Sequence, residues 1–127
     1  MTGAFGDAIT VPASQRAKKQ MKQLVTKGIF SEQRDVWRMG ASLGIATGNY
    51  VASGKRETFQ NVNSLDPDEI FAAVMMGLYP QAAPEDRLKK LVDHAEWGID
   101  EIFRRIEIGT IDWPTLGLLP TKSGKSG

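Results

Sequence analysis

The sequence has no cysteine, a single histidine (His94), and no apolar run near the roughly 18 residues that a membrane-spanning helix needs. Without cysteine, disulfides, thiolate metal sites and thiol nucleophiles are excluded. A single histidine also excludes metal sites built on two histidines. No apolar block typical of a signal peptide stands near the N-terminus, so we expect a soluble cytoplasmic protein with no membrane partner.

The formal net charge is only +1, but the charges are distributed unevenly along the chain. Residues 1–60 contain nine Lys or Arg against four acids, whereas residues 61–108 contain five Lys or Arg against ten acids. This split suggests that the first part meets a polyanion or an acidic partner. The alternative is that the two parts attract each other, or that both sets of charges are simply solvated.

Two consecutive helices are predicted over residues 65–108. The first starts at Asp66, because Asp66 can accept from free N–H groups, Pro67 has no N–H to lose, and Glu69 can reach back to Asp66. The second starts at Pro84, which two acids follow at the positive end of the helix dipole. Their apolar stripes are Ile70, Phe71, Val74, Met75 and Leu78, and then Leu88, Leu91, Val92, Ala95, Ile99, Ile102, Phe103 and Ile106. We expect the two helices to pair through these stripes.

An earlier helix, over roughly residues 15–26, is predicted to be amphipathic and basic. Ser14 is its expected cap and Gly28 its expected stop. Its apolar positions share one face, and lysines and an arginine occupy the remainder. Such a helix can lie along nucleic-acid phosphates, an anionic membrane surface or an acidic partner. The membrane is the weakest of these options, because the apolar side lacks aromatic or bulky residues.

Ser31 is predicted to cap a further helix, which contains the small residues Gly40, Ala41 and Gly44. These residues would let another backbone come close, although each glycine costs about 1 kcal/mol of intrinsic helix stability relative to alanine. The pattern indicates tight helix packing, and an approach point for a ligand is the less favoured interpretation.

Helical periodicity fails between residues 47 and 63, where turn residues are frequent. Tyr50-Val51 and Thr58-Phe59 flank Ser53-Gly54, which predicts a short β-hairpin near residues 49–59. Lys55 and Arg56 would lie at its tip, either contacting phosphate or merely solvated. The candidate nucleic-acid-binding residues are therefore Arg16, Lys18, Lys19, Lys22, Lys27, Lys55 and Arg56.

The predicted fold class is mainly α, a single small domain of about four helices with that short hairpin. The helical domain is expected to cover residues 14–109, after a flexible arm over residues 1–13. Residues 110–119 are apolar enough to dock onto the helices or onto a partner. Residues 120–127 are small and polar and are expected to be disordered.

His94 is the strongest candidate for acid–base chemistry, with Asp93, Glu96 and Glu101 near it in sequence. No serine or cysteine stands at helical spacing from it to act as a nucleophile. An ordinary histidine on a helix surface, or a partly packed one, is therefore favoured. We predict a protein that is not an enzyme.

Two further motifs are weak. The terminal Ser123-Gly124-Lys125-Ser126 lacks the earlier glycine of a phosphate-binding loop, because position 119 is leucine. Asp66, Asp68 and Glu69 could hold magnesium, but helix capping explains them without further assumptions. We expect no metal and no cofactor.

From Gly28 to about Gly98, a little over half the chain, the order of features resembles a family of small proteins encoded beside bacterial DNA phosphorothioation and related phage-defence systems. The matching pieces are Ile29-Phe30-Ser31, the segment from Asp35 to Gly44, Gly54-Lys55-Arg56-Glu57, and Glu69-Ile70-Phe71. The family usually has alanine at the position of Gly40. The resemblance implies an accessory component of a DNA-modification or restriction assembly and brings no catalytic residues with it.

Two functional hypotheses follow. The first is an accessory or adaptor protein whose basic residues bind DNA phosphates without strong sequence preference. The second is a helical interaction module whose acidic half binds a larger protein, with Trp97 and Trp113 as partner-binding anchors. An enzyme is the least favoured class, and self-association stays open.

Overall fold

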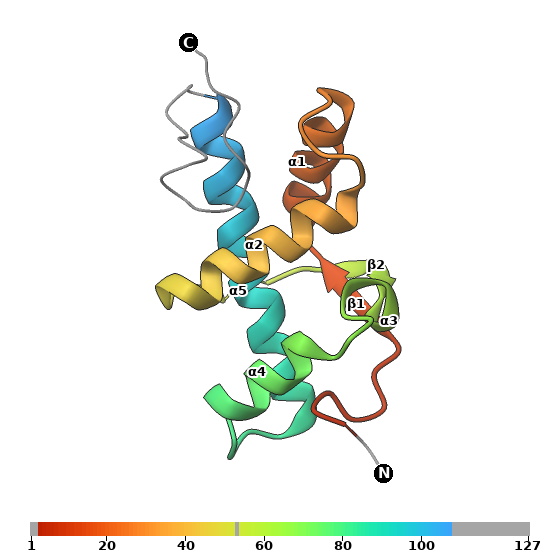
Figure 1. Cartoon of the computed structure of the whole chain (residues 1–127), viewed down its shortest axis with the longest axis vertical. Coiled ribbons are helices and arrows are strands. Elements are labelled where there is room, and N and C mark those ends of the chain that lie inside the picture. The colour runs from red at the N-terminus through yellow and green to blue at the C-terminus, as the bar shows by residue number, and fades with distance from the viewer. Residues whose placement is uncertain (1–2, 53, 108–127) are drawn as a thin grey trace.

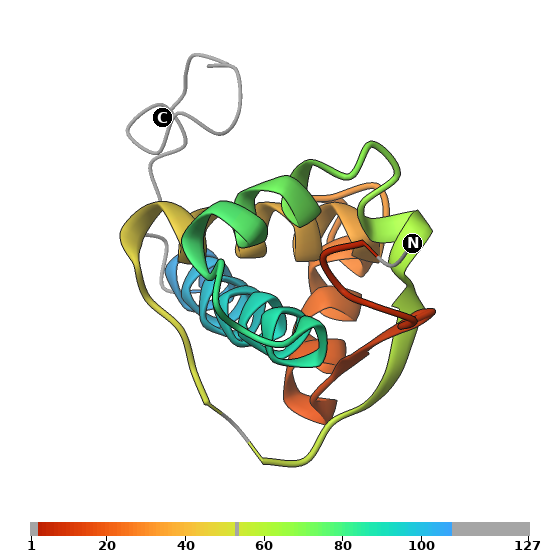
Figure 2. The same ribbon diagram turned by 90° about the horizontal axis from the view of Figure 1, so that it is seen from below.

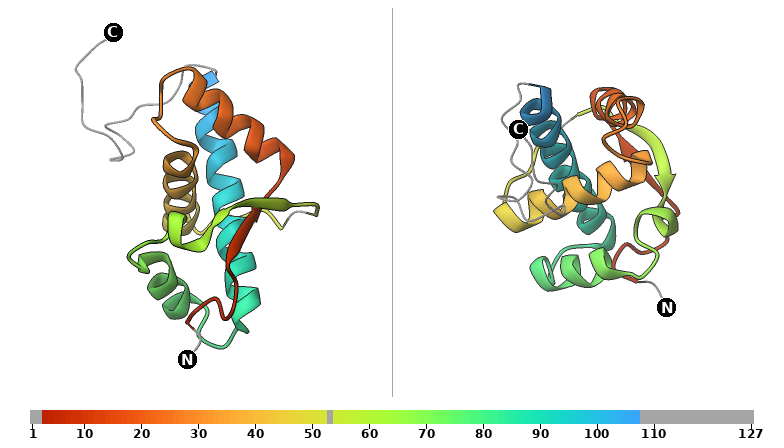
Figure 3. Two further views of the ribbon diagram at one scale, coloured as in Figure 1. Left: turned by 90° about the vertical axis from the view of Figure 1, so that its right-hand side faces the viewer. Right: turned by 45° about the horizontal axis from the view of Figure 1, so that its top comes forward.

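The computed structural model describes residues 3–52 and 54–107. In chain order the elements are β1 (Thr10–Ala13), α1 (Gln15–Thr26), α2 (Gln33–Thr47), β2 (Glu57–Asn61), α3 (Val62–Leu65), α4 (Ile70–Leu78) and α5 (Pro84–Glu107). The long helix α5 is central, and α2 crosses it near its middle (Figure 1). α1 lies beside the C-terminal half of α5, and α4 lies near its N-terminal end (Figure 3). The predicted class, mainly α with a small two-stranded antiparallel sheet, is confirmed.

The crossing of α2 over α5 brings backbone against backbone. A Cβ atom added at Gly98 would lie 1.8 Å from the carbonyl oxygen of Gly40, and one added at Gly44 would lie 2.3 Å from the carbonyl oxygen of His94. Real carbon atoms do not approach oxygen so closely, so these positions require glycine. The expected role of Gly40 and Gly44 in tight helix packing is confirmed.

The core is built around the apolar stripe of α5. Leu91, Ala95, Ile99 and Ile102 are buried there, as predicted from their spacing. Trp37 of α2 is only 1% exposed and meets the ring of Phe71 edge to face, with 5.8 Å between the ring centroids. Burying each large apolar side chain stabilises the fold by about 1.5–3 kcal/mol. This layer therefore supplies much of the force that holds α2, α4 and α5 together.

The small sheet differs from the predicted hairpin in one strand. Thr58 and Phe59 lie in β2, as expected, but β2 pairs with β1 and not with Tyr50-Val51. The register places Val11 opposite Gln60 and Pro12 opposite Thr58, so Phe59 has no partner across the ladder. This is a β-bulge, and Pro12 favours it because proline has no N–H to give to a ladder.

The N-terminal residues that the structure describes belong to the fold, which corrects the expected flexible arm. Phe5 and Val11 are buried. The buried guanidinium of Arg87 donates to the carbonyl oxygens of Ala4 at 3.3 Å and Tyr79 at 2.9 Å. Local periodicity could not reveal this, because the segment is ordered by a strand and an arginine from distant parts of the sequence.

Asp66 caps α4, but from further upstream than expected. Its carboxylate accepts from the N–H groups of Phe71 at 3.0 Å and Ala72 at 2.9 Å. The helix does not start at Asp66, because Pro67 disfavours helical geometry in the residue before it. Glu69, with φ of 57°, turns the chain into the helix instead of reaching back.

The expected pairing of this helix with α5 through a full apolar stripe is wrong. Phe71 and Met75 are buried, but Ile70 is 58% exposed and Leu78 51% exposed. The main partner of α5 is α2.

The predicted ends of α1 are confirmed, whereas the predicted start of α2 is wrong by one residue. α1 is capped by Ser14, whose Oγ accepts from the N–H of Ala17 at 3.0 Å, and it ends before Gly28 at φ of 79°, as predicted. α2 is capped at Glu32 and not at Ser31, since the carboxylate of Asp35 accepts from the N–H of Glu32 at 3.2 Å.

The predictions for residues 110–119 and 120–127 fall outside the described residues. No helix within the described ranges is long and apolar enough to cross a membrane.

Replacing Gly98 with alanine should destabilise the protein strongly, because the new methyl group would overlap the backbone of α2. We expect Gly98→Ala to lower the free energy of unfolding by about 3 kcal/mol, measured by urea denaturation. Gly77→Ala in α4 is the matched control, since a Cβ there meets nothing within 4 Å. The control should leave stability unchanged or raise it by up to about 1 kcal/mol. Equal effects of the two variants would contradict the close approach.

Candidate nucleic-acid interface

α1 presents two faces with different chemistry. Ala17, Gln20, Met21 and Leu24 are buried on the side that faces the core. Positions 15, 18, 19 and 22 recur at three and four residues and share the other side. Three of these four positions carry lysine. The helical spacing therefore gathers Lys18, Lys19 and Lys22 on one face.

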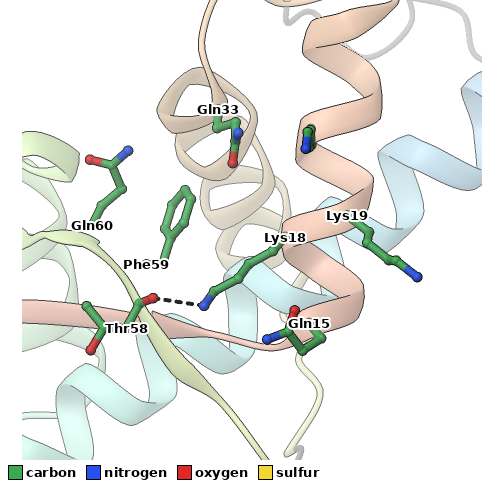
Figure 4. A pocket seen from close by; sticks show the side chains of 8 residues that line it. Gln15, Lys18, Lys19, Gln33, Thr58, Phe59 and Gln60 are labelled. Carbon is green, nitrogen blue, oxygen red and sulfur yellow. Dashed lines mark hydrogen bonds between the residues drawn. The ribbon is translucent and has the colours of Figure 1, made fainter.

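This face lines an open pocket of about 620 Å³ between α1, β2 and the first turn of α2. Its lining consists of Gln15, Lys18, Lys19, Lys22, Gln33, Thr58, Phe59 and Gln60. In Figure 4, Lys18 reaches across to β2, where its Nζ donates to the carbonyl oxygen of Thr58 at 2.8 Å. Lys19 extends away from β2 in the same view. We call this site the lysine pocket.

Carboxylates of α5 fix the orientation of α1. Glu96 accepts from both the N–H of Ser14 at 2.8 Å and its Oγ at 2.7 Å, at the very start of the helix. One turn later, Asp100 accepts from Gln20 Nε2 at 2.8 Å and from Arg16 Nη2 at 2.9 Å. Because these contacts hold the opposite side of α1 against α5, the lysine face is turned toward β2 and the solvent.

The predicted basic residues separate into free and paired groups. Lys19 and Lys22 are exposed and have no carboxylate within ion-pair distance among the described residues. Lys18 bonds to a backbone oxygen and not to a carboxylate. By contrast, Arg16 pairs with Asp100 and Lys27 pairs with Glu107. Arg16 and Lys27 are not part of the lining of the lysine pocket.

Arg56 is not the exposed phosphate contact that the sequence predicted. Its side chain is 7% exposed, and its Nη2 lies 2.7 Å from Asp93 Oδ1. Its Nε lies 3.8 Å from Glu96 Oε2. The neighbouring Lys55 is exposed, as expected, but does not line the pocket. The difference arises because the connection from α2 to β2 passes along α5 (Figure 2), where the N–H of Val51 also donates to the carbonyl oxygen of Asp93.

Some of the basic residues are therefore neutralised by ion pairs with acidic residues of the same chain. Arg16, Lys27 and Arg56 of the basic part meet Asp100, Glu107 and the pair Asp93 and Glu96 of the acidic part. This supports the alternative that the two parts attract each other. It also leaves Lys19 and Lys22 as the part of the basic helix that is open to a ligand.

Comparisons of the chain with protein-family models, with curated proteins and with solved structures found no match.

His94 is buried in the interior and is not on a helix surface, which corrects the expectation. Its Nδ1 lies 2.7 Å from the carbonyl oxygen of Asn49 and its Nε2 lies 3.0 Å from the hydroxyl of Tyr79. Only a donor fits opposite a carbonyl oxygen, so Nδ1 carries the proton and Nε2 accepts from Tyr79 when the ring is neutral. The Nζ of Lys90 lies 3.6 Å from the ring centroid of Tyr50, which stacks on His94 edge to face. This cluster holds the loop after α2 against α5.

The other candidates have plain structural settings. Trp97 is partly buried on α5, and Trp113 falls outside the described residues. Asp66 serves as the cap of α4. Within residues 3–52 and 54–107, no three His, Asp or Glu side chains are grouped closely enough to hold a metal ion.

Sequence reasoning missed the uncharged half of the lysine pocket. Gln15 shares the helical spacing of the lysines and could have been assigned to their face. Phe59 and Gln60 could not, because a strand with unknown partner has no assigned face. Gln33 lines the pocket only because the first turn of α2 lies beside α1 and β2.

Removing the Arg56 guanidinium should lower the stability of the fold, because two nearly buried carboxylates would lose the positive charge beside them. Asp93 is 2% exposed and Glu96 10% exposed in their side chains. We expect Arg56→Ala to lower the free energy of unfolding by about 3 kcal/mol, measured by urea denaturation. Lys55→Ala, one residue away and exposed, should change it by less than about 0.5 kcal/mol. A small effect of Arg56→Ala would mean that Arg56 is solvated as the sequence first suggested.

Proposed function

We propose that this chain is a non-catalytic accessory protein that binds DNA phosphates, without strong sequence preference, through the lysine pocket. The observation that carries the proposal is the exposed pair Lys19 and Lys22, which no described carboxylate neutralises, beside the charged Lys18. A free ammonium group can replace counterions on a phosphate backbone, whereas one that is already paired gains little by doing so.

The arrangement suits a chain of phosphates better than a single anion. Lys18 and Lys22 are one helical turn apart, about 6 Å along the axis of α1, so the charge forms a row. The carboxylates of Glu96 and Asp100 engage the other side of α1 and are not in the pocket lining. A polyanion approaching the lysines therefore meets few opposing charges.

The setting that we propose is a bacterial DNA-modification or defence assembly, in which a larger protein is the second partner. The support for this setting is the resemblance over residues 28–98. The binding function itself rests on Lys18, Lys19 and Lys22 and does not depend on the resemblance.

A second function, a helical module that binds a larger protein, is favoured by one observation. The acidic half exposes apolar side chains along α4, with Ile70 58%, Met76 47% and Leu78 51% exposed. Trp97, also in this half, is partly exposed on α5. Exposed apolar groups of this kind are typical of interaction surfaces. In this case the lysines of α1 would be dispensable for assembly.

The DNA-binding function is tested by removing two charges from the pocket. We expect Lys19→Gln/Lys22→Gln to weaken binding of a labelled DNA duplex at least tenfold at low salt, in a fluorescence anisotropy titration. Comparing about 50 mM and about 200 mM salt, the slope of log affinity against log salt should decrease in magnitude by about 2, since two phosphate contacts are lost.

The matched control is Lys89→Gln/Arg105→Gln, which removes the same charge from exposed positions of α5. In each case the carboxylate left behind keeps another basic partner: Arg56 for Asp93 and Arg104 for Glu101. The control should bind DNA nearly as the parent does. Absence of DNA binding by the parent at low salt, or equal losses in both double variants, would reject the lysine pocket as a DNA site. A partner complex that survives the Lys19→Gln/Lys22→Gln change would support the second function.

A further inference from the structure

The lysine pocket contains an aromatic ring and amide groups that phosphate binding does not need. Phe59, which is partly buried and also packs against the core, lines it from β2. Gln60 lines it from the same strand and Gln33 from α2. Gln15 also lines it, although its amide nitrogen already donates to Glu57 Oε1 at 3.2 Å. The lysines alone would be enough to bind phosphate. The ring and the amides therefore point to a ligand that has an aromatic or hydrogen-bonding group in addition to its phosphates.

The β-bulge explains how Phe59 comes to face the pocket. In a regular strand, successive side chains point to opposite faces, so Phe59 and Gln60 would not share one. The register shift at Val11 and Pro12 leaves Phe59 without a partner across the ladder. A bulge of this kind re-aims a side chain. Figure 4 shows Phe59 and Gln60 rising from β2 on one side, toward the turn of α2 that bears Gln33.

The amides of Gln33 and Gln60 have no hydrogen-bond partner among the described residues. Each offers a donor and an acceptor, which matches the edge of a nucleobase. An aromatic ring provides a surface on which an unstacked base can lie. Lys19 and Lys22 stand on the α1 side of the same pocket, where they can meet the flanking phosphates.

We propose that the lysine pocket takes one unstacked nucleobase against Phe59, so that the protein prefers single-stranded nucleic acid to a duplex. The inference rests on the proposed phosphate-binding function and deepens it. In a duplex the bases are stacked and paired, and only phosphates and groove edges could meet the lysines. A single strand can place a base in the pocket as well, and its volume of about 620 Å³ lies in the range of small-ligand sites.

The first test compares an oligothymidylate of about 12 nucleotides with a DNA duplex of the same length, at one salt concentration, by fluorescence anisotropy. The single strand should bind about tenfold more tightly, since stacking of one base contributes about a factor of ten in affinity. Phe59→Leu should remove this preference by weakening the binding of the single strand about tenfold. Phe59→Tyr keeps a ring and should retain the preference.

Phe103→Leu is the matched control, because Phe103 is also a partly buried phenylalanine but does not line the pocket. It should bind both oligonucleotides as the parent does. Thermal unfolding of each variant reports whether it is folded. A second measurement leaves the protein intact: a strand of the same length with abasic central positions keeps its phosphates and should bind the parent about tenfold more weakly than oligothymidylate.

The outcomes separate the two proposals. Equal binding of single strand and duplex, or equal binding of the abasic and complete strands, would overturn the base pocket while leaving the phosphate site in place. Binding that is at least tenfold weaker in Lys19→Gln/Lys22→Gln, together with loss of the single-strand preference in Phe59→Leu, supports both proposals. No binding of any strand at low salt would overturn the phosphate site and the base pocket together. An oligouridylate and an oligodeoxyuridylate differ only in the 2′-hydroxyl, so tighter binding of the first assigns the base pocket to RNA and tighter binding of the second assigns it to DNA.

Discussion

Two backbones pack closely against each other at the crossing of α2 and α5. A carbonyl oxygen of the facing helix occupies the space where Gly44 and Gly98 would have a Cβ, and Ile99 occupies that space at Gly40. Three glycines in helices cost about 3 kcal/mol of intrinsic propensity in total. That cost is offset by burial of the α5 stripe and of Trp37. The crossing also sets where the first turn of α2 lies, and with it one wall of the lysine pocket.

The acidic residues of α5 act as internal counterions. They hold α1 by its N-terminus through Glu96 and by its flank through Asp100, and they hold the loop after α2 through Arg56. Exposed pairs such as Arg16 with Asp100 contribute about 0–1 kcal/mol each, so their value lies more in orientation than in stability. The buried Arg56 is different, because removing one partner of a buried pair leaves a charge that water cannot reach.

Local sequence signals were sufficient for the long helices and insufficient wherever distant residues decide. Periodicity and caps predicted α1 and α5, and the small residues of α2 predicted a close helix crossing. The strand β1 was missed because its partner lies far along the chain, and because it is only four residues long and contains Pro12, which argues against a strand. Arg56 was misassigned for the same reason: turn residues around it indicate a loop, but only the position of Asp93 decides whether that loop is buried. The α1 lysines could be gathered by spacing, whereas Phe59 required the register of the sheet.

The N-terminal segment has more influence on the pocket than its composition suggests. Pro12 cannot donate to the ladder, and the register shifts beside it, which leaves Phe59 unpaired in β2. If β1 and β2 paired without a bulge, Phe59 and Gln60 would face opposite sides, and the pocket would lose one of them. Lys19 and Lys22 would be unaffected, because α5 sets the orientation of α1, whereas Lys18 also bonds to Thr58 of β2. In the proposed site, different parts of the chain would therefore meet the phosphates and the base: α1 held by α5 would meet the first, and the bulged sheet the second.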